Sequence, residues 1–232
     1  MATLTPTKDT GATTKEAPMI YAEIDRIVDD ATLARPFEGS GLNGAFVADT
    51  LSAMLTHERC GVHLYRSAEA RANNPILQAK YRQFGGQTLE HVEILEGLIT
   101  QLGGNPSYVS PMARAVEATN SKNLEATFLG SGSLDPMTAE TAILDAVFLA
   151  ETIDHSNWRM LAALSRELPA GPMQDAFDEA VSRVEEQEDE HLEWAQSTRE
   201  RLMSLQAKSD AFASAGMKAE ELVSRVRNWL AT

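Results

Sequence analysis

Apolar residues recur every three or four positions in four long stretches of the chain. These stretches cover residues 45–72, 76–102, 137–167 and 173–206. This spacing is typical of amphipathic α-helices, because it places the apolar side chains on one face of the helix. No stretch alternates apolar and polar residues for long enough to predict a β-strand, so the pattern favours an all-α fold.

The breaks between these stretches predict how the helices connect. Clusters rich in proline, glycine and asparagine follow the first helix at 73–75 and the third at 169–172. Turns this short predict two antiparallel helical hairpins. A long crossover, which begins at the GGNP sequence of 103–106 and contains a short helix within 111–129, joins the second helix to the third. The chain is therefore expected to form a four-helix bundle with one long connection.

Three segments lie outside the predicted bundle domain of residues 45–206. Residues 1–18 are rich in Thr, Ala and Lys without apolar periodicity, and predict a disordered tail. Residues 19–44 form an N-terminal segment with a short helical stretch. Residues 207–232 predict a C-terminal helix with one apolar face. We expect this helix to pack on the bundle or on a partner subunit, and the protein to be a homo-oligomer such as a dimer.

Polar and charged residues interrupt the apolar face near the middle of every predicted bundle helix. They are Glu58 in the first helix, Thr88 and His91 in the second, Glu151 with Asp154 or His155 in the third, and Glu188 and His191 in the fourth. Within each hairpin these residues lie at similar distances along the chain from the connecting turn. Because residues equally far from a turn share one level of a hairpin, all of them are expected in a single layer.

Such a layer needs charge compensation. Buried carboxylates without partners would cost many kcal/mol, so they either share protons or pair with cations. No Lys or Arg occupies a core-facing position at that level, which leaves a metal ion as the counter-charge. Carboxylate oxygens and imidazole nitrogens suit iron or manganese and, less distinctively, zinc. Carboxylates that converge from four helices are suited to hold two such ions.

Composition narrows the range of partners. The 232 residues carry a formal net charge of -14 without a basic patch, which argues against binding to nucleic acid or to an anionic membrane. No segment approaches the run of about 18 apolar residues that crosses a bilayer, and the N-terminus lacks the features of a signal peptide. Cys60 is the single cysteine, which fits a reducing compartment. The expected location is the cytoplasm.

The polar layer resembles that of the ferritin-like superfamily, which includes ferritins, bacterioferritins, rubrerythrins, manganese catalases and di-iron oxidases. In that family the first and third helices carry Glu, and the second and fourth carry Glu-x-x-His. Glu58, Glu151 and the pair Glu188 and His191 match this layout, and the likeness covers residues 45–206. The second motif departs from it, because 88-TLEH-91 keeps His91 but has Thr88 in place of the carboxylate.

The resemblance implies a function as well as a fold. It implies a non-haem centre with two ions, most simply iron, that reacts with O2 or peroxide as a ferroxidase, peroxidase or catalase does. The second interpretation is a bundle without redox chemistry that serves as a structural or stress-related binding module. The family likeness assigns the metal ligands but no separate catalytic residue.

Because Thr88 stands in place of a carboxylate, another residue is needed as a ligand. His155, one turn after Glu151, and Glu90, beside His91, are candidate metal ligands. Gln87 and Glu93 are weaker candidates on the same helix as Glu90. Asp154 is a candidate either as a ligand or as a residue that orients one. An altered two-metal site is the first expectation and a single-metal site the second. Tyr65 and Trp158 are expected in the core, and Tyr65 has a second possible role as a hydrogen-bond donor to a ligand.

Overall fold

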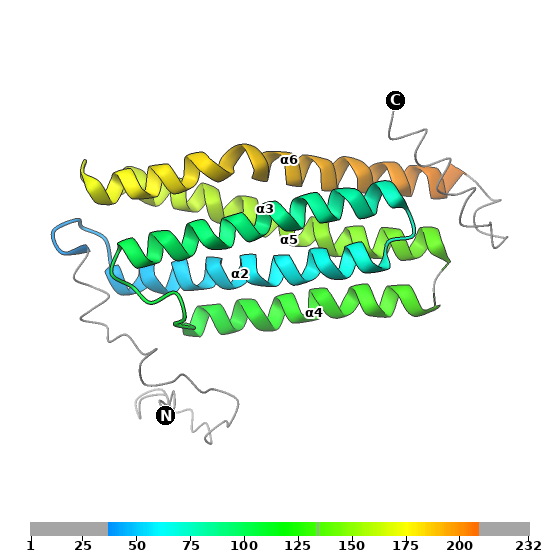
Figure 1. Ribbon diagram of the computed structural model, residues 1–232, viewed down its shortest axis with the longest axis horizontal. Helices are drawn as coiled ribbons and strands as arrows, with labels where there is room; N and C mark the ends of the chain where they lie inside the picture. The colour runs from blue at the N-terminus through cyan, green and yellow to red at the C-terminus, as the bar shows by residue number, and fades with distance from the viewer. Residues whose placement is uncertain (1–36, 134, 209–232) are drawn as a thin grey trace, which may run out of the picture.

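The computed structural model describes residues 37–133 and 135–208, and within these ranges it is helical without any strand (Figure 1). The helices are α2 (Gly44–Arg71), α3 (Pro75–Gln101), α4 (Pro111–Ser133), α5 (Pro136–Glu167) and α6 (Pro172–Lys208). The predicted all-α class is confirmed, and the four predicted helices correspond to α2, α3, α5 and α6. The expectations for residues 1–36 and 209–232 lie outside the described residues.

Side chains just before the helices fix where the helices begin. Asn43 accepts a hydrogen bond from the backbone N–H of Phe46 at the start of α2, and Asn74 accepts one from Ile76 at the start of α3. Asp135 accepts hydrogen bonds from two backbone N–H groups of the first turn of α5. These caps satisfy donors that the helix itself leaves unpaired. The breaks in the sequence are therefore the points where one helix ends and the next is capped.

The helix α4 differs from the expectation. A short helix was expected within 111–129, but α4 extends over 23 residues and packs along α2 and α5. Figure 1 shows it lying alongside α2 for most of its length. The hydroxyl of Ser110 accepts a hydrogen bond from the backbone N–H of Ala113 and caps the first turn. The crossover is thus a fifth long helix on the outside of the α2, α3, α5 and α6 bundle.

The bundle contains two separate apolar clusters, one toward each end. One cluster includes Leu51, Leu95 and Phe177, and the other includes Phe84 and Leu144. Along α3, α5 and α6 the buried polar residues of the predicted layer fall between these two clusters, and in α2 Glu58 lies near their boundary, between Leu55 and Val62 of the first cluster. Within the described ranges, no helix combines the length and the apolar character needed to cross a membrane.

Two glycines allow α2 and α3 to approach closely beside the polar layer. A Cβ atom on Gly85 would lie 3.0 Å from the Cβ of Tyr65, and one on Gly61 would lie 3.1 Å from the Cγ2 of Thr88. Both distances are shorter than ordinary van der Waals contact, so a larger residue would push the helices apart. The spacing of these helices at the layer therefore depends on glycine.

Candidate metal centre

Five of the predicted ligands come together in the polar layer. They are Glu58 from α2, His91 from α3, Glu151 from α5, and Glu188 and His191 from α6. Each is at most 3% exposed. They form two groups of three that share Glu188, namely Glu58, His91 and Glu188, and Glu151, Glu188 and His191. In each group one possible ligand atom per residue lies within 4.8 Å of the others.

The contacts place Glu188 between the two imidazole rings. The Nδ1 atom of His91 lies 3.1 Å from Oε1 of Glu188 and 3.6 Å from Oε2 of Glu58. The Nδ1 atom of His191 lies 3.3 Å from Oε2 of Glu151 and 3.7 Å from Oε1 of Glu188. Neither Nδ1 atom makes a hydrogen bond, and the facing carboxylate oxygens are likewise buried without a hydrogen-bond partner.

Unpaired polar atoms in such number are costly when water is excluded. The unpaired atoms of the layer are carboxylate oxygens and imidazole Nδ1 atoms, and they converge on the same small region. A cation in each group of three would satisfy them, because carboxylate and imidazole are ligands of divalent transition metals. The residues present therefore fit two ions that share Glu188.

Two glutamines orient the histidines. The Nε2 atom of His91 lies 2.8 Å from Oε1 of Gln187, and the Nε2 atom of His191 lies 3.0 Å from Oε1 of Gln87. Because an amide oxygen can only accept, each Nε2 carries the proton and donates it to the glutamine. When Nδ1 has lost its proton, the ring presents the Nδ1 lone pair to the carboxylates, which is the form that binds a metal ion.

Two aromatic residues orient the carboxylates in the same way. The hydroxyl of Tyr65 donates to Oε1 of Glu151 over 2.7 Å, and the indole Nε1 of Trp158 donates to Oε1 of Glu58 over 2.7 Å. Each donor belongs to the opposite hairpin from its acceptor. In both glutamates the bond holds one oxygen, so the other oxygen, Oε2, faces the histidine.

Thr88 does not replace the missing carboxylate. Its hydroxyl is buried and donates to the backbone carbonyl of Phe84 over 2.9 Å. Asp154, by contrast, is buried beside Glu58 and adds a fourth carboxylate to the layer. Burial, followed by the negative charges of Glu58, Glu188 and Glu151, raises the pKa of Asp154 well above its usual value.

The pKa shifts show how the layer is neutralised in the absence of a metal ion. Burial lowers the pKa of His91, but contact with Glu188 and Glu58 outweighs burial and raises it from 6.5 to about 10. Burial raises the pKa of Glu188 from 4.5 to about 8, and the charges of Glu151 and Glu58 act in the same direction while His91 opposes them. Near neutral pH the layer therefore holds protons, which a metal ion must displace.

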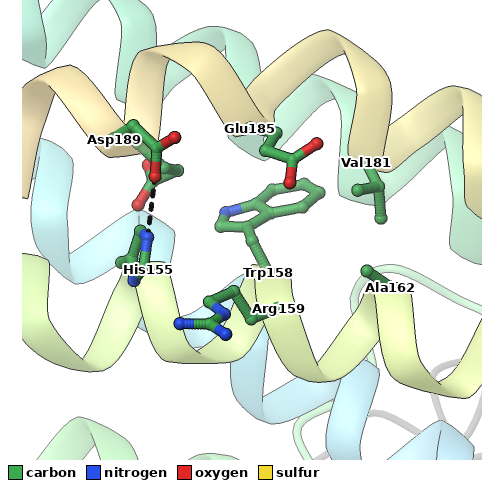
Figure 2. Close-up of a pocket in the computed structure, with 8 residues that line it drawn as sticks. His155, Trp158, Arg159, Ala162, Val181, Glu185 and Asp189 are labelled. Atoms are coloured by element: carbon green, nitrogen blue, oxygen red, sulfur yellow. Dashed lines mark hydrogen bonds and ion pairs between the residues drawn. The ribbon is translucent and has the colours of Figure 1, made fainter.

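The structure does not bring the two remaining candidates into the layer. His155 is partly exposed, and its Nε2 atom lies 2.8 Å from Oδ1 of Asp189 at the surface between α5 and α6 (Figure 2). Glu90 is exposed on α3, as is Glu93. A residue adjacent to a core-facing position is turned by about 100° around the helix. That rotation carries His155 away from Asp154 and Glu90 away from His91.

Gln187 is the functional residue that the sequence pattern did not indicate. It lies four residues before His191, as Gln87 lies four residues before His91, and the segments 87-QTLEH-91 and 187-QEDEH-191 share three letters. This short repeat is the signal that would have identified the pair. Trp158 was expected in the core, where it is buried, but its bond to Glu58 gives it a further role at the centre.

The chain matches no protein-family model, no curated protein and no solved structure. The case for a metal centre therefore depends on its own side chains.

Proposed function

We propose that this protein is a non-haem di-metal carboxylate protein of the ferritin-like type, which reacts with O2 or peroxide. The observation that carries the proposal is the pair of overlapping groups that share Glu188, each with one imidazole Nδ1 and unpaired carboxylate oxygens. In this assignment one ion is held by Glu58, His91 and Glu188, and the other by Glu151, His191 and Glu188.

We take iron as the metal of this centre, with manganese or zinc as the alternatives. The donor set contains oxygen and nitrogen donors without thiolate, which suits all three metals. Two redox-active ions held side by side supply the electrons for reduction of O2 or peroxide, as in a ferroxidase, peroxidase or catalase. The bridging position of Glu188 between the two groups is what distinguishes this arrangement from two independent sites.

The surrounding residues support this chemistry by holding the ligands in place. Gln87 and Gln187 fix the tautomers of the histidines, and Tyr65 and Trp158 each hold one oxygen of a carboxylate. Apolar clusters on both sides limit access of bulk water along the bundle axis. Asp154, buried beside Glu58, adds a further carboxyl group to the layer, where the second helix carries Thr88.

One observation favours the alternative of a metal-free structural or binding module. The raised pKa values of His91 and Glu188 mean that protons alone can compensate much of the charge in the layer. In that case the layer is a buried network of shared protons, and the bundle has no redox chemistry. The two functions differ in metal content, which an experiment measures directly.

The experiment is metal analysis of the purified protein, followed by anaerobic titration of metal-free protein with Fe2+ and measurement of O2 uptake. We expect two ions per chain and O2 consumption. The Glu188→Ala variant removes the ligand common to both groups and should lose both properties. Glu186→Ala, an exposed glutamate two residues away, is the matched control and should retain them. Trace metal in the wild type, or unchanged binding in Glu188→Ala, would end the proposal.

A further inference from the structure

A cavity of about 260 Å3 lies between α5 and α6 (Figure 2). The residues that line it are His155, Trp158, Arg159, Ala162, Val181, Glu185, Glu188 and Asp189. Most of them are charged or able to bind a metal ion. The cavity therefore differs from an ordinary apolar packing defect, which would be lined by aliphatic side chains.

The inner end of this cavity reaches the metal centre. Glu188 lines it and belongs to both groups of ligands, and Trp158 lines it while donating to Glu58. Two other cavities, one between α3 and α6 and one between α4 and α5, include none of the five ligands of the centre. The α5 and α6 cavity is thus a direct connection from the surface to the ligand that both ions would share.

The outer end carries the residue types that bind cations. Asp189 is 66% exposed and His155 is 21% exposed, and the two are in contact at 2.8 Å. Glu185 is exposed, one turn before Glu188 and Asp189 on α6. Successive turns of a helix are about 5.4 Å apart. A cation could therefore pass from Glu185 and Asp189 to Glu188 in a single short step along the same face.

The size of the cavity is suitable for a hydrated ion. A water molecule occupies about 30 Å3 in the liquid, and an octahedral divalent ion carries about six. The volume of about 260 Å3 accommodates such an ion with its shell. Glu188, which lines this cavity, is only 1% exposed.

We propose that this cavity is the route by which divalent metal ions reach the centre, with Glu185, Asp189 and His155 as the residues that first receive them. The inference rests on the proposed function, because it requires that the centre binds such ions. The opposing charge in the cavity is Arg159, which forms no ion pair with any other described residue. Removal of the Arg159 charge should therefore favour the entry of cations into the cavity, whereas removal of the Glu185 charge should disfavour it.

The first experiment obstructs the cavity. Metal-free protein is mixed anaerobically with Co2+, and the rate and final amount of binding are followed by visible absorption. Ala162→Phe places a ring in the cavity, while Ala163→Phe places the same ring on the exposed face one residue later. We expect Ala162→Phe to slow binding without changing the final amount, and Ala163→Phe to bind like the wild type. Equal rates in both variants would overturn the route but not the metal centre.

The second experiment changes the charge of the cavity without changing its volume greatly. We expect Glu185→Gln combined with Asp189→Asn to slow binding of Co2+ about tenfold at low salt, since surface charge steers ions. Glu186→Gln, which removes an exposed carboxylate outside the cavity, should have little effect. Arg159→Ala should accelerate binding. Faster binding in the Glu185 and Asp189 variant with slower binding in Arg159→Ala would indicate a path for anions and overturn the inference. Wild-type protein that binds no Co2+ would contradict the proposed function itself.

Discussion

Thr88 and Asp154 are the residues at which this centre departs from its expected ligand pattern. The Thr88 hydroxyl is occupied by the carbonyl of Phe84, and its methyl group faces Gly61 at close range. Asp154 lies one turn after Glu151 and is only 5% exposed. At the α3 position where a carboxylate was expected the side chain is thus small, and the fourth carboxylate of the layer lies on α5.

If Asp154 rather than Thr88 acts at the centre, two isosteric substitutions should have different effects on metal affinity. Asp154→Asn should weaken metal binding by about 10- to 100-fold, because residues that ligate or orient a ligand have effects of that size. Thr88→Val should leave the affinity close to that of the wild type, because the hydroxyl faces its own helix. Anaerobic titration with Fe2+ measures both variants. Equal losses in the two variants would contradict the assignment of Asp154.

The sequence predicted which side chains meet in the polar layer better than it predicted the residues that orient them. Glu58, His91, Glu151, Glu188 and His191 each interrupt an apolar face, and this interruption is visible within a single helix. Gln187 and Trp158 act across to the other hairpin. Their roles depend on which helices face each other and at what height, and no pattern within one helix contains that information.

Among the elements, the turn between α2 and α3 is held by a residue of α5. The carboxylate of Glu140 accepts hydrogen bonds from the backbone N–H groups of Asn73 and Asn74. It is 2% exposed, and one of its oxygens has no hydrogen-bond partner. Burial raises the pKa of Glu140 from 4.5 to about 7, although the two backbone bonds act in the opposite direction.

This shift predicts a pH dependence of stability. The folded state binds the Glu140 proton more tightly than the unfolded chain, so stability falls as the pH rises from about 4.5 to about 7. Relative to Glu140→Gln, which keeps the acceptor but does not titrate, the wild type should lose up to about 3 kcal/mol across this window. Urea unfolding at several pH values measures the difference.

The control for this prediction is Glu167→Gln, which removes an exposed carboxylate from the same helix. It should leave the pH dependence of unfolding like that of the wild type. A wild type and a Glu140→Gln variant with parallel pH profiles would show that Glu140 remains ionised in the folded protein.

The helix α4 was the element least accessible to sequence reasoning. Its contacts with the bundle include hydrogen bonds from polar side chains beside a few apolar residues such as Leu124. Asn123 donates to the backbone carbonyl of Ala146 over 2.7 Å, and Thr127 forms a hydrogen bond with Ser67 at 2.9 Å. Hydrogen bonds of this kind leave no 3.6-residue apolar period to detect, whereas the proline and asparagine caps made the start of α3 predictable.

In the whole molecule the polar layer divides the core in two. The apolar clusters on either side account for most of the buried hydrophobic residues, and the layer between them contributes unpaired polar atoms instead. Such a layer lowers stability unless its charges are compensated. The stability of the entire bundle should therefore depend on what occupies the layer.

Metal removal is expected to lower the melting temperature. A ligand that binds only the folded state at about 100 times its Kd adds about 2.7 kcal/mol. For a chain of this size that corresponds to roughly 5–10 °C. Calorimetry of metal-free and Fe2+-loaded protein under anaerobic conditions measures the shift, and Glu188→Ala should show none. Identical melting temperatures for the two wild-type forms would favour the metal-free alternative.

The bonds that cross between the hairpins also determine when the centre can exist during synthesis of the chain. The first hairpin, α2 with α3, contributes only Glu58 and His91 to the two groups of ligands. Gln187, which orients His91, and Glu188, which both groups share, are in α6, near the end of the described chain. A growing chain therefore cannot assemble either site before α6 has been made and docked. On the proposed function, a bound metal ion marks a molecule that has finished folding.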